Sequence, residues 1–589
     1  MGLAMAFVMV VLCGAAGSLL LGRLRENLNS LELMATGGAI GLGAFAMSIF
    51  VVGMLGVYNV GLPIATALFG ILGLIGLRYW RFKPSFDPLC VAVVFFLCMA
   101  LCYVSLPPDG NDWDGLAYHL AVPKLYLLEG RIHNIAFTHH SNFPFLWEML
   151  YTWGLWANGA TAAKLFHWAA LSYLCIGVAG FAQRLGANRP WLGSLILASS
   201  PIVFWESTVA YADLATALYV FLAVLAIHRG IVETERKLIL LAGVLMGFAL
   251  GTKYLALVSV AILGLTALGT LLVRRQVQMI PTLLLSGLLA VLIGCPWYIK
   301  TYLYTSNPVY PFAYSLFGGR NWSEENAAAY RGDQLKFGMG RSVDRLIMAP
   351  NNMVSFPEKF MDPVGLIVGE RAYTVASSGP AMAAAPFVSS TAGLPLGFVI
   401  ASFLAWFGLM QQTRYLIPIF PILSATAAVA QGRLRKRALW LVVALQSIAA
   451  LWIFGGALLP WTSAIWNREK REEYLTRRFQ PYEAYRFINE QTAPSAKIGL
   501  YDEPRGFYLE RQYLWANAGH HMLIPYSNFS TSSDLVEGLK SKGITHILIN
   551  RRFWPQESIE SWRIQLEQAI AVQEIRLLFD ARGVEVYEL

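Results

Sequence analysis

The sequence predicts a polytopic α-helical membrane protein that carries a small soluble α/β domain in its C-terminal part. Three observations support this fold class. The 589-residue chain is 56% hydrophobic and only 14% charged, which is typical of integral membrane proteins and not of soluble ones. The charged residues cluster between apolar runs. After Pro460 the composition becomes that of a soluble domain.

About 13 to 14 apolar runs are candidates for crossing a membrane, since a span needs roughly 20 apolar residues. They lie at 3–21, 33–56, 60–79, 88–106, 163–183, 190–206, 209–228, 237–251, 254–273, 280–298, 373–390, 393–410, 414–431 and 438–460. No basic segment precedes the first run, so we expect it to be a retained helix and not a cleaved signal. The run 143–158 is also apolar, but it is short and contains Glu148.

Basic residues between the runs predict the orientation of the spans, because lysine and arginine concentrate in cytoplasmic loops. They lie at 23–25, 78–83, 184–189, 228–237, 274–275 and 432–437. All of these basic loops fall on the cytoplasmic side only if 143–158 lies along the membrane surface and 373–390 crosses the membrane. Both termini, the acidic loop 107–145 and the long loop 299–372 then face away from the cytoplasm. The same loops account for the net charge of +9, so we expect no nucleic-acid partner.

The stretch 107–120 (PPDGNDWDGLAYHL) places Asp109, Asp112 and Asp114 directly after a strongly apolar run. Carboxylates at a membrane boundary are costly to hold and usually face water, a cation or a reacting group. Asp112 and Asp114 could converge on one divalent cation, or one could act as a base that the other orients. The alternative is a solvated loop in which Asp114 caps a helix that starts near Gly115.

Other polar residues are expected on the same face of the membrane. His139 could bind a metal with its neighbour His140, although a surface or hydrogen-bonding role is the better interpretation in the absence of a third ligand. Glu148 lies inside an apolar segment, where an unpaired carboxylate costs several kcal/mol or becomes protonated. Asp213 begins an apolar run, so it could simply cap a helix.

Three cations are also predicted at this face: Lys253 in GTKYL, Lys300 in PWYIKTY and Arg414 in QQTRYLIP. Snorkelling toward the membrane interface explains each of them individually. Cations gathered at the same face as a group of acids would suit a lipid-linked phosphate.

In chain order, the segments WDGLAYHL, NFPFLWE, Asp213, GTKY, NPVYPF and TRYLIPIFP resemble the C-type glycosyltransferase superfamily (GT-C). This superfamily includes the protein O-mannosyltransferases and the aminoarabinose lipid A transferase. The resemblance extends over roughly residues 107–431. It implies a multi-span fold, a polyprenyl-phosphate sugar donor and an essential acid in the first outer loop.

The resemblance also implies roles for residues. Asp114 matches the first-loop acid, with Asp112 as its neighbour or second candidate, and Asp213 matches a later acid. Arg414 and Tyr415 match an Arg-Tyr-x-x-Pro element that meets the donor phosphate, together with Lys253 and Lys300. The residues expected to support substrate or acids are Tyr118, His119, His139, Glu148 and Asp213. The resemblance leaves open whether Asp112, Asp114 and Asp213 hold a divalent cation, Mg²⁺ or Mn²⁺, because only some members of the superfamily need a metal.

The implied function is an inverting membrane glycosyltransferase with Asp114 as base, in a bacterial plasma (inner) membrane with its active site in the periplasm. Its partners would be the lipid-linked donor and a lipid, glycan or protein acceptor. One alternative is an enzyme like the O-antigen ligases and polymerases, but loop 299–372 contains no histidine. The other alternative is a polytopic lipid or glycan transporter, which would require charges within the spans.

We expect four parts along the chain: N-terminal transmembrane helices at 1–106, the first outer loop at 107–162, a transmembrane GT-C core at 163–460 and a soluble periplasmic domain at 461–589. In this last part the periodicity predicts helices at 481–491 and 533–542. Strands are predicted at 497–501, 544–550, 574–579 and 583–588.

Overall fold

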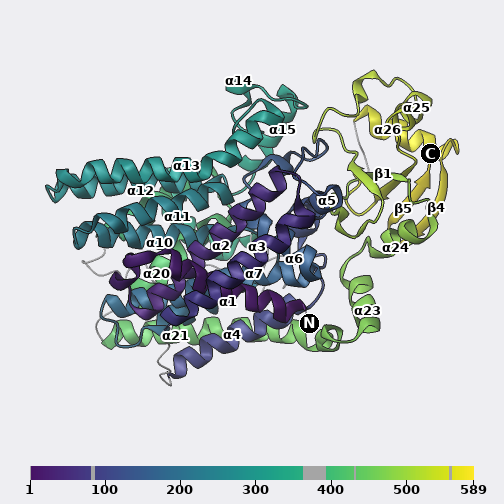
Figure 1. The fold of residues 1–589 in the computed structure, drawn as a ribbon. Coiled ribbons are helices and arrows are strands. Elements are labelled where there is room, and N and C mark those ends of the chain that lie inside the picture. Colours follow the sequence, from purple (N-terminus) through teal and green to yellow (C-terminus); the bar gives the residue numbers. More distant parts are fainter. Residues whose placement is uncertain (1, 81–86, 362–392, 430–432, 556–559) are drawn as a thin grey trace.

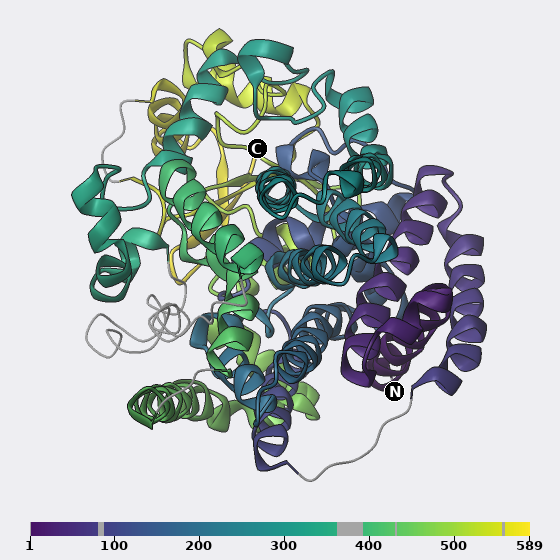
Figure 2. The ribbon, with the colours of Figure 1, turned by 90° about the vertical axis from the view of Figure 1, so that its left-hand side faces the viewer.

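The computed structural model describes residues 2–80, 87–361, 393–429, 433–555 and 560–589. A large helical bundle carries a five-stranded sheet domain at one end (Figure 1). Both labelled termini lie toward this end of the bundle, and Figure 2 shows several helices of the bundle along their axes while others are tilted. The predicted span 373–390 falls outside the described residues.

Nine helical segments within the described ranges are long and apolar enough to cross a membrane. The chain is therefore a multi-pass membrane protein. Eight of these segments correspond to α1 (Gly2–Leu20), α2 (Ser30–Met54), α3 (Tyr58–Gly76), α4 (Pro88–Ser105), α7 (Ala160–Arg184), α10 (Asp213–Val232), α12 (Leu255–Val273) and α13 (Ile280–Thr305). The ninth, Leu439–Ile465, begins within α21 (Arg433–Ala450) and includes the short helix α22 (Gly456–Leu458).

The other predicted spans form shorter helices. The run 190–206 is broken into two helices, because proline disfavours helical geometry in the residue that precedes it and Pro201 follows Ser200. The helices in these runs are α8 (Trp191–Ala198), α9 (Pro201–Glu206), α11 (Arg236–Thr252), α19 (Gly393–Leu409), the 3₁₀ helix Thr413–Ile419 and α20 (Phe420–Ala427).

The apolar run around Glu148 forms α6 (Leu146–Asn158), which has 13 residues. At 1.5 Å per residue it is about 20 Å long, which is too short to cross a hydrocarbon layer of about 30 Å. Other α-helices that the structure describes before the sheet domain are α5 (Ala121–Glu129), α14 (Tyr314–Phe317), α15 (Glu324–Leu335), α16 (Val343–Ser355) and α23 (Arg468–Arg478).

Helices α1 and α2 pack with their backbones in contact, because glycines face each other where they cross. A Cβ atom at Gly41 of α2 would overlap the carbonyl group of Cys13 in α1, and one at Gly17 would overlap the carbonyl group of Gly37. Small residues permit this close approach in membranes, where packing and not the hydrophobic effect drives helix association.

A buried ion-pair group ties three helices together. Glu32 of α2 accepts hydrogen bonds from Arg184 of α7 at 2.6 Å and from Arg229 of α10 at 3.4 Å. Arg229 also pairs with Glu233, at 2.9 Å. Both arginines belong to the basic clusters that predict the orientation of the spans, and in the structure they also have packing partners.

The C-terminal sheet has the order β2-β1-β3-β5-β4. Strands β1, β2 and β3 are parallel, whereas β5 runs antiparallel to both β3 and β4. Their bounds are β1 (Lys497–Tyr501), β2 (Gln512–Trp515), β3 (His546–Asn550), β4 (Arg576–Ala581) and β5 (Val584–Glu588).

Helices cover both faces of this sheet. On one face, α25 (Ser532–Ser541) and α26 (Ser561–Ala571) pack over apolar side chains of β1, β2 and β3. On the other face, α24 (Tyr482–Gln491) shares a core with Leu116 and Ala117 of the acidic loop. The loop that carries the candidate acids is therefore built into the core of the C-terminal domain.

We predict that Gly41→Val lowers the thermal midpoint of the detergent-solubilised protein, because overpacking at a close contact costs about 1–3 kcal/mol. The matched control is Gly70→Val in α3, where no described atom lies within 4 Å of the position a Cβ would take. Thermal unfolding followed by size-exclusion chromatography measures both variants. Equal midpoints for the two variants would contradict the contact between α1 and α2.

Candidate active site

A cavity of about 820 Å³ lies between the bundle and the long outer loop. Its polar end contains charged, histidine and tyrosine side chains, whereas its deeper wall is apolar. The polar lining includes Asp114, Tyr118, His119, His140, Glu148, Lys253, Tyr330, Arg414 and Tyr415, with Arg331, Asp333 and Lys336 of the long loop as further charged residues. The apolar wall is formed by Leu255, Leu257, Val258, Ile262, Ala405, Trp406, Leu409, Pro418 and Ile419.

Asp114 faces the polar end of this cavity. Its Oδ2 accepts a 2.7 Å ion-paired hydrogen bond from Arg414, and its backbone N–H donates to the Tyr211 hydroxyl at 3.1 Å. Burial alone would raise the pKa of Asp114, but the positive charges around it, foremost that of Arg414, outweigh burial and lower the pKa below its usual value. The side chain therefore pairs with Arg414 and makes no capping bond to the described helix at Gly115.

Asp112 points away from the cavity, although only one residue separates it from Asp114. Its Oδ2 accepts from the backbone N–H of Ala210 at 3.3 Å, and no described residue donates to its buried Oδ1. Burial raises the pKa of Asp112 to about 7, against the opposing effect of the Lys164 charge. Gly115 permits this placement, because a Cβ there would overlap the Asp112 carboxyl.

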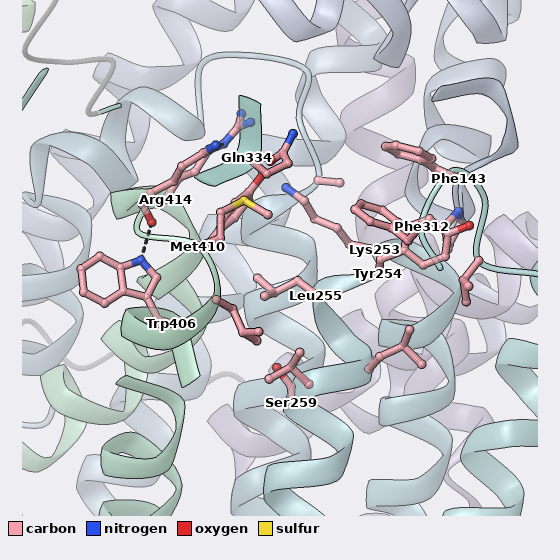
Figure 3. A pocket seen from close by; sticks show the side chains of 18 of the residues that line it. Phe143, Lys253, Tyr254, Leu255, Ser259, Phe312, Gln334, Trp406, Met410 and Arg414 are labelled. Carbon is pink, nitrogen blue, oxygen red and sulfur yellow. Dashed lines mark hydrogen bonds between the residues drawn. The ribbon is translucent and has the colours of Figure 1, made fainter. Parts of the chain in front are cut away.

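A second ion pair lies beside the first. Both carboxylate oxygens of Asp213, at the start of α10, accept from Lys253, at 2.7 and 2.8 Å. Lys253 directly follows α11 and lies 5.0 Å from the ring centre of Tyr415, which Arg414 approaches to 5.3 Å. Figure 3 shows Lys253 and Arg414 on the same cavity, with Leu255 and Ser259 further along α12.

A histidine and a glutamate form the next part of the wall. Nδ1 of His119 lies 2.6 Å from Oε1 of Glu148, and no described residue binds the buried Oε2. Tyr118 stacks on His140 with ring centres 4.2 Å apart. Glu148, whose carboxylate is costly to bury in the apolar helix α6, thus has His119 as a partner and faces the cavity.

Four predicted site residues are not among the described residues that line the cavity: Asp112, His139, Asp213 and Lys300. Lys300 donates to the carbonyl oxygens of Ser141 at 2.8 Å and Phe143 at 3.4 Å, so it anchors the loop behind the site. The geometry gives no support to a phosphate-binding role for it. His139 lies outside the described lining too, although it stacks near His140, with ring centres 4.0 Å apart.

The three carboxylates proposed as metal ligands do not converge. Arg414 holds Asp114, Lys253 holds Asp213, and Asp112 points toward Ala210. Among the residues that the structure describes, no group of three histidine, cysteine or acidic side chains is arranged to hold a metal ion. These residues therefore do not fit the divalent cation that the resemblance left open.

Sequence reasoning missed several residues of the site. Tyr211 supports the backbone of Asp114, and α15 of the long loop brings Tyr330 and Gln334 over the cavity. Ser323 followed by Glu324 and Glu325 could have indicated the start of α15, because a serine cap and acidic residues favour a helix N-terminus. Nothing in the sequence links Tyr211 to the acidic loop, because that contact spans 97 residues.

Comparisons with known proteins address the fold. A family model described as a domain of unknown function, DUF8201, matches residues 152–343. No curated protein matches the sequence.

Two solved structures are similar over most of the chain. ArnT from Cupriavidus metallidurans bound to undecaprenyl phosphate has a TM-score of 0.55 and 14% sequence identity, over 85% of this chain and 97% of that one. The apo state of the same ArnT has a TM-score of 0.54 and 15% identity, over 85% and 98%. The predicted GT-C resemblance is thereby confirmed at the level of the fold.

The raised pKa of Asp112 predicts a pH-dependent loss of stability. Its pKa in the folded state, about 7, lies above the ordinary aspartate value of 3.8. The native state therefore binds the proton more tightly, and the linked stability is present below about pH 4 and lost as pH rises through about 7.

Asp112→Asn removes this titration, so the thermal midpoint of the variant should rise relative to wild type between about pH 4 and about pH 7. Thermal melts over this range measure the effect. Asp580→Asn, at an exposed position of β4, is the control and should follow wild type. A pH-independent difference for Asp112→Asn would contradict the prediction.

Proposed function

We propose that the protein is a membrane glycosyltransferase that moves a sugar from a polyprenyl-phosphate donor to an acceptor on the non-cytoplasmic face. The observation that carries this proposal is the cavity, whose polar end holds Asp114 and Glu148 together with the cations Arg414 and Lys253 while its deeper wall is apolar. A lipid with a phosphate head and an isoprenoid chain has the same two-part chemistry.

The apolar wall suits the isoprenoid chain. Leu257 lines the cavity and is also 41% exposed on the surface of α12, so the cavity is continuous with the face that lipid would cover. The polar end suits the phosphate, because Arg414 and Lys253 bring two positive charges close to Tyr415. The ArnT structure of the same fold was determined with undecaprenyl phosphate bound.

In the proposed reaction, Asp114 takes the proton of the acceptor hydroxyl. The acceptor oxygen forms a bond to the anomeric carbon while the bond from that carbon to the phosphate oxygen breaks, with inversion. Polyprenyl phosphate leaves, and Arg414 and Lys253 stabilise the negative charge that develops on it. Charge held by groups that are already oriented in a partly dry site is the largest contribution to catalysis in many enzymes.

Arg414 connects the base to the leaving group. Without substrate, its charge contributes strongly to the low pKa of Asp114 and makes this carboxylate a weak base. A bound donor phosphate competes for the same guanidinium, so the pKa of Asp114 rises as the donor binds. The base is thereby activated only in the presence of the donor. No step of this mechanism passes through a metal ion, because the described carboxylates do not fit one.

The positions of the basic loops support a site on the non-cytoplasmic face, and the resemblance implies the periplasmic side of a bacterial plasma membrane. Both termini lie toward the end of the bundle that carries the sheet domain (Figure 1), as the predicted orientation requires. The acceptor is a lipid, a glycan or a protein hydroxyl, and the sheet domain stands beside the polar end, where an acceptor would enter.

We predict that Asp114→Asn lowers the kcat of sugar transfer by at least about 100-fold, because general-base catalysis contributes at least this much. Donor binding should persist, since Arg414 and Lys253 are unchanged. The assay is transfer of radiolabelled sugar from a polyprenyl-phosphate donor. Asp344→Asn, at an exposed site on α16, should keep wild-type activity.

Transfer by Asp114→Asn at a near wild-type rate would contradict the assignment of the base. A wild-type protein that leaves the donor chemically intact but moves it across vesicle membranes would support the transporter alternative. Consumption of a pyrophosphate-linked glycan and not of the monophosphate donor would support the ligase alternative.

We also predict that Lys253→Met weakens binding of undecaprenyl phosphate about tenfold or more, since a charged hydrogen bond is worth about 1.5–3 kcal/mol. This variant leaves Asp213 buried without its partner, so it should also be less stable. Lys253→Met/Asp213→Asn should recover stability but not affinity. Binding is measured by fluorescence quenching in detergent micelles, and recovery of affinity in the double variant would contradict a phosphate-binding role.

A further inference from the structure

Trp113 lies between the two acids of the first outer loop and points in a third direction. Asp112 contacts Ala210, Asp114 pairs with Arg414, and the Trp113 ring meets the C-terminal domain. Three successive side chains thus bind three different parts of the molecule. The position of the loop depends on all three contacts.

Arg505 of the C-terminal domain holds the Trp113 ring. Its guanidinium lies 4.0 Å from the ring centre, and Phe553 approaches the same ring edge-on at 5.3 Å. Glu503 fixes the guanidinium through two hydrogen bonds of 2.6 and 2.5 Å, and Asn550 of β3 donates to Glu503 at 2.9 Å. Both Glu503 and Arg505 are buried.

The start of the loop is held by the same part of the chain. Asp109 accepts from Tyr474 at 2.7 Å and from Arg478 at 3.0 Å, both in α23. The carbonyl oxygen of Pro108 accepts from Tyr508 at 2.6 Å. Leu116, just beyond the acids, lies in the core under the sheet. The segment is thus clamped on both sides of Trp113.

We infer that the C-terminal domain positions the base, with Arg505 and Glu503 acting through Trp113 to hold Asp114 at the polar end of the cavity. The inference rests on the proposed function and adds positioning residues that do not themselves touch the substrate. A cation over an indole ring attracts the ring more strongly when the contact is shielded from water, as it is for the buried Arg505. A small displacement of a catalytic group can reduce a rate by up to about 100-fold.

Arg505→Met should lower kcat about tenfold or more without changing the KM for the polyprenyl-phosphate donor, because Arg414 and Lys253 still bind the phosphate. Arg505→Lys keeps a cation over the ring and should recover part of kcat. Trp113→Ala should lower kcat as much as Arg505→Met does, and the double variant should have a kcat no lower than that of either single variant. Non-additive losses of kcat would indicate that Arg505 and Trp113 act through the same contact, whereas a general loss of stability would not produce this result.

Arg563→Met is the matched control. Arg563 also pairs with a carboxylate, Asp502, at 2.6 Å and also stacks on tryptophan rings, Trp554 and Trp562, but all of these partners lie within the C-terminal domain. This variant should lower the stability of the domain and leave kcat unchanged.

Hydrogen–deuterium exchange gives a readout that does not need activity. Arg505→Met should increase exchange in peptides covering 107–120 while the peptides of β1 and β3 stay protected, and Arg563→Met should leave 107–120 unchanged. The inference would be overturned if Arg505→Met had wild-type kcat and unchanged exchange. It would also be overturned if both arginine variants lost kcat equally. If the wild-type protein transfers no sugar, the proposed function fails, and the exchange data still decide whether Arg505 holds the loop.

Discussion

Asp114 and Arg414 lie 300 residues apart in the sequence, and their 2.7 Å ion pair closes the polar end of the cavity. A buried pair of this kind is costly to assemble, and removing one partner leaves an uncompensated charge. The rest of the site compensates for that cost: Tyr211 supports the acid, Tyr415 faces the cation, and Asp213 with Lys253 forms a second pair beside the first. The other elements of the fold can be understood as supports for this arrangement.

Each support comes from a different part of the chain. The bundle contributes Lys253 after α11 and Asp213 on α10, and the long outer loop contributes α15 above the cavity. The sheet domain contacts the acidic loop through Trp113. The tight contacts between α1 and α2 and the buried Glu32 group make the bundle a firm base for these parts. The candidate chemistry thus depends on tertiary structure over the whole chain.

Sequence patterns predicted much of this structure. Long apolar runs gave most of the spanning helices, and the predicted strand at 497–501 coincides with β1. The missed elements include β2 and α26, which have weaker patterns: β2 has only four residues, and α26 mixes buried and exposed polar side chains. The sequence also predicted that Asp114 and Arg414 lie at the same face of the membrane. It could not show that Lys300 would bind backbone carbonyls, because residue type determines charge but not the direction of a side chain.

The continuity between the apolar wall and the exposed side of Leu257 bears on how a lipid product would depart. An isoprenoid tail could slide out within the plane of the bilayer and never enter water, which avoids a penalty of about 0.8 kcal/mol for every methylene exposed. Exchange of spent carrier for fresh donor would then proceed by two-dimensional diffusion. Turnover would respond to the fluidity and thickness of the surrounding membrane.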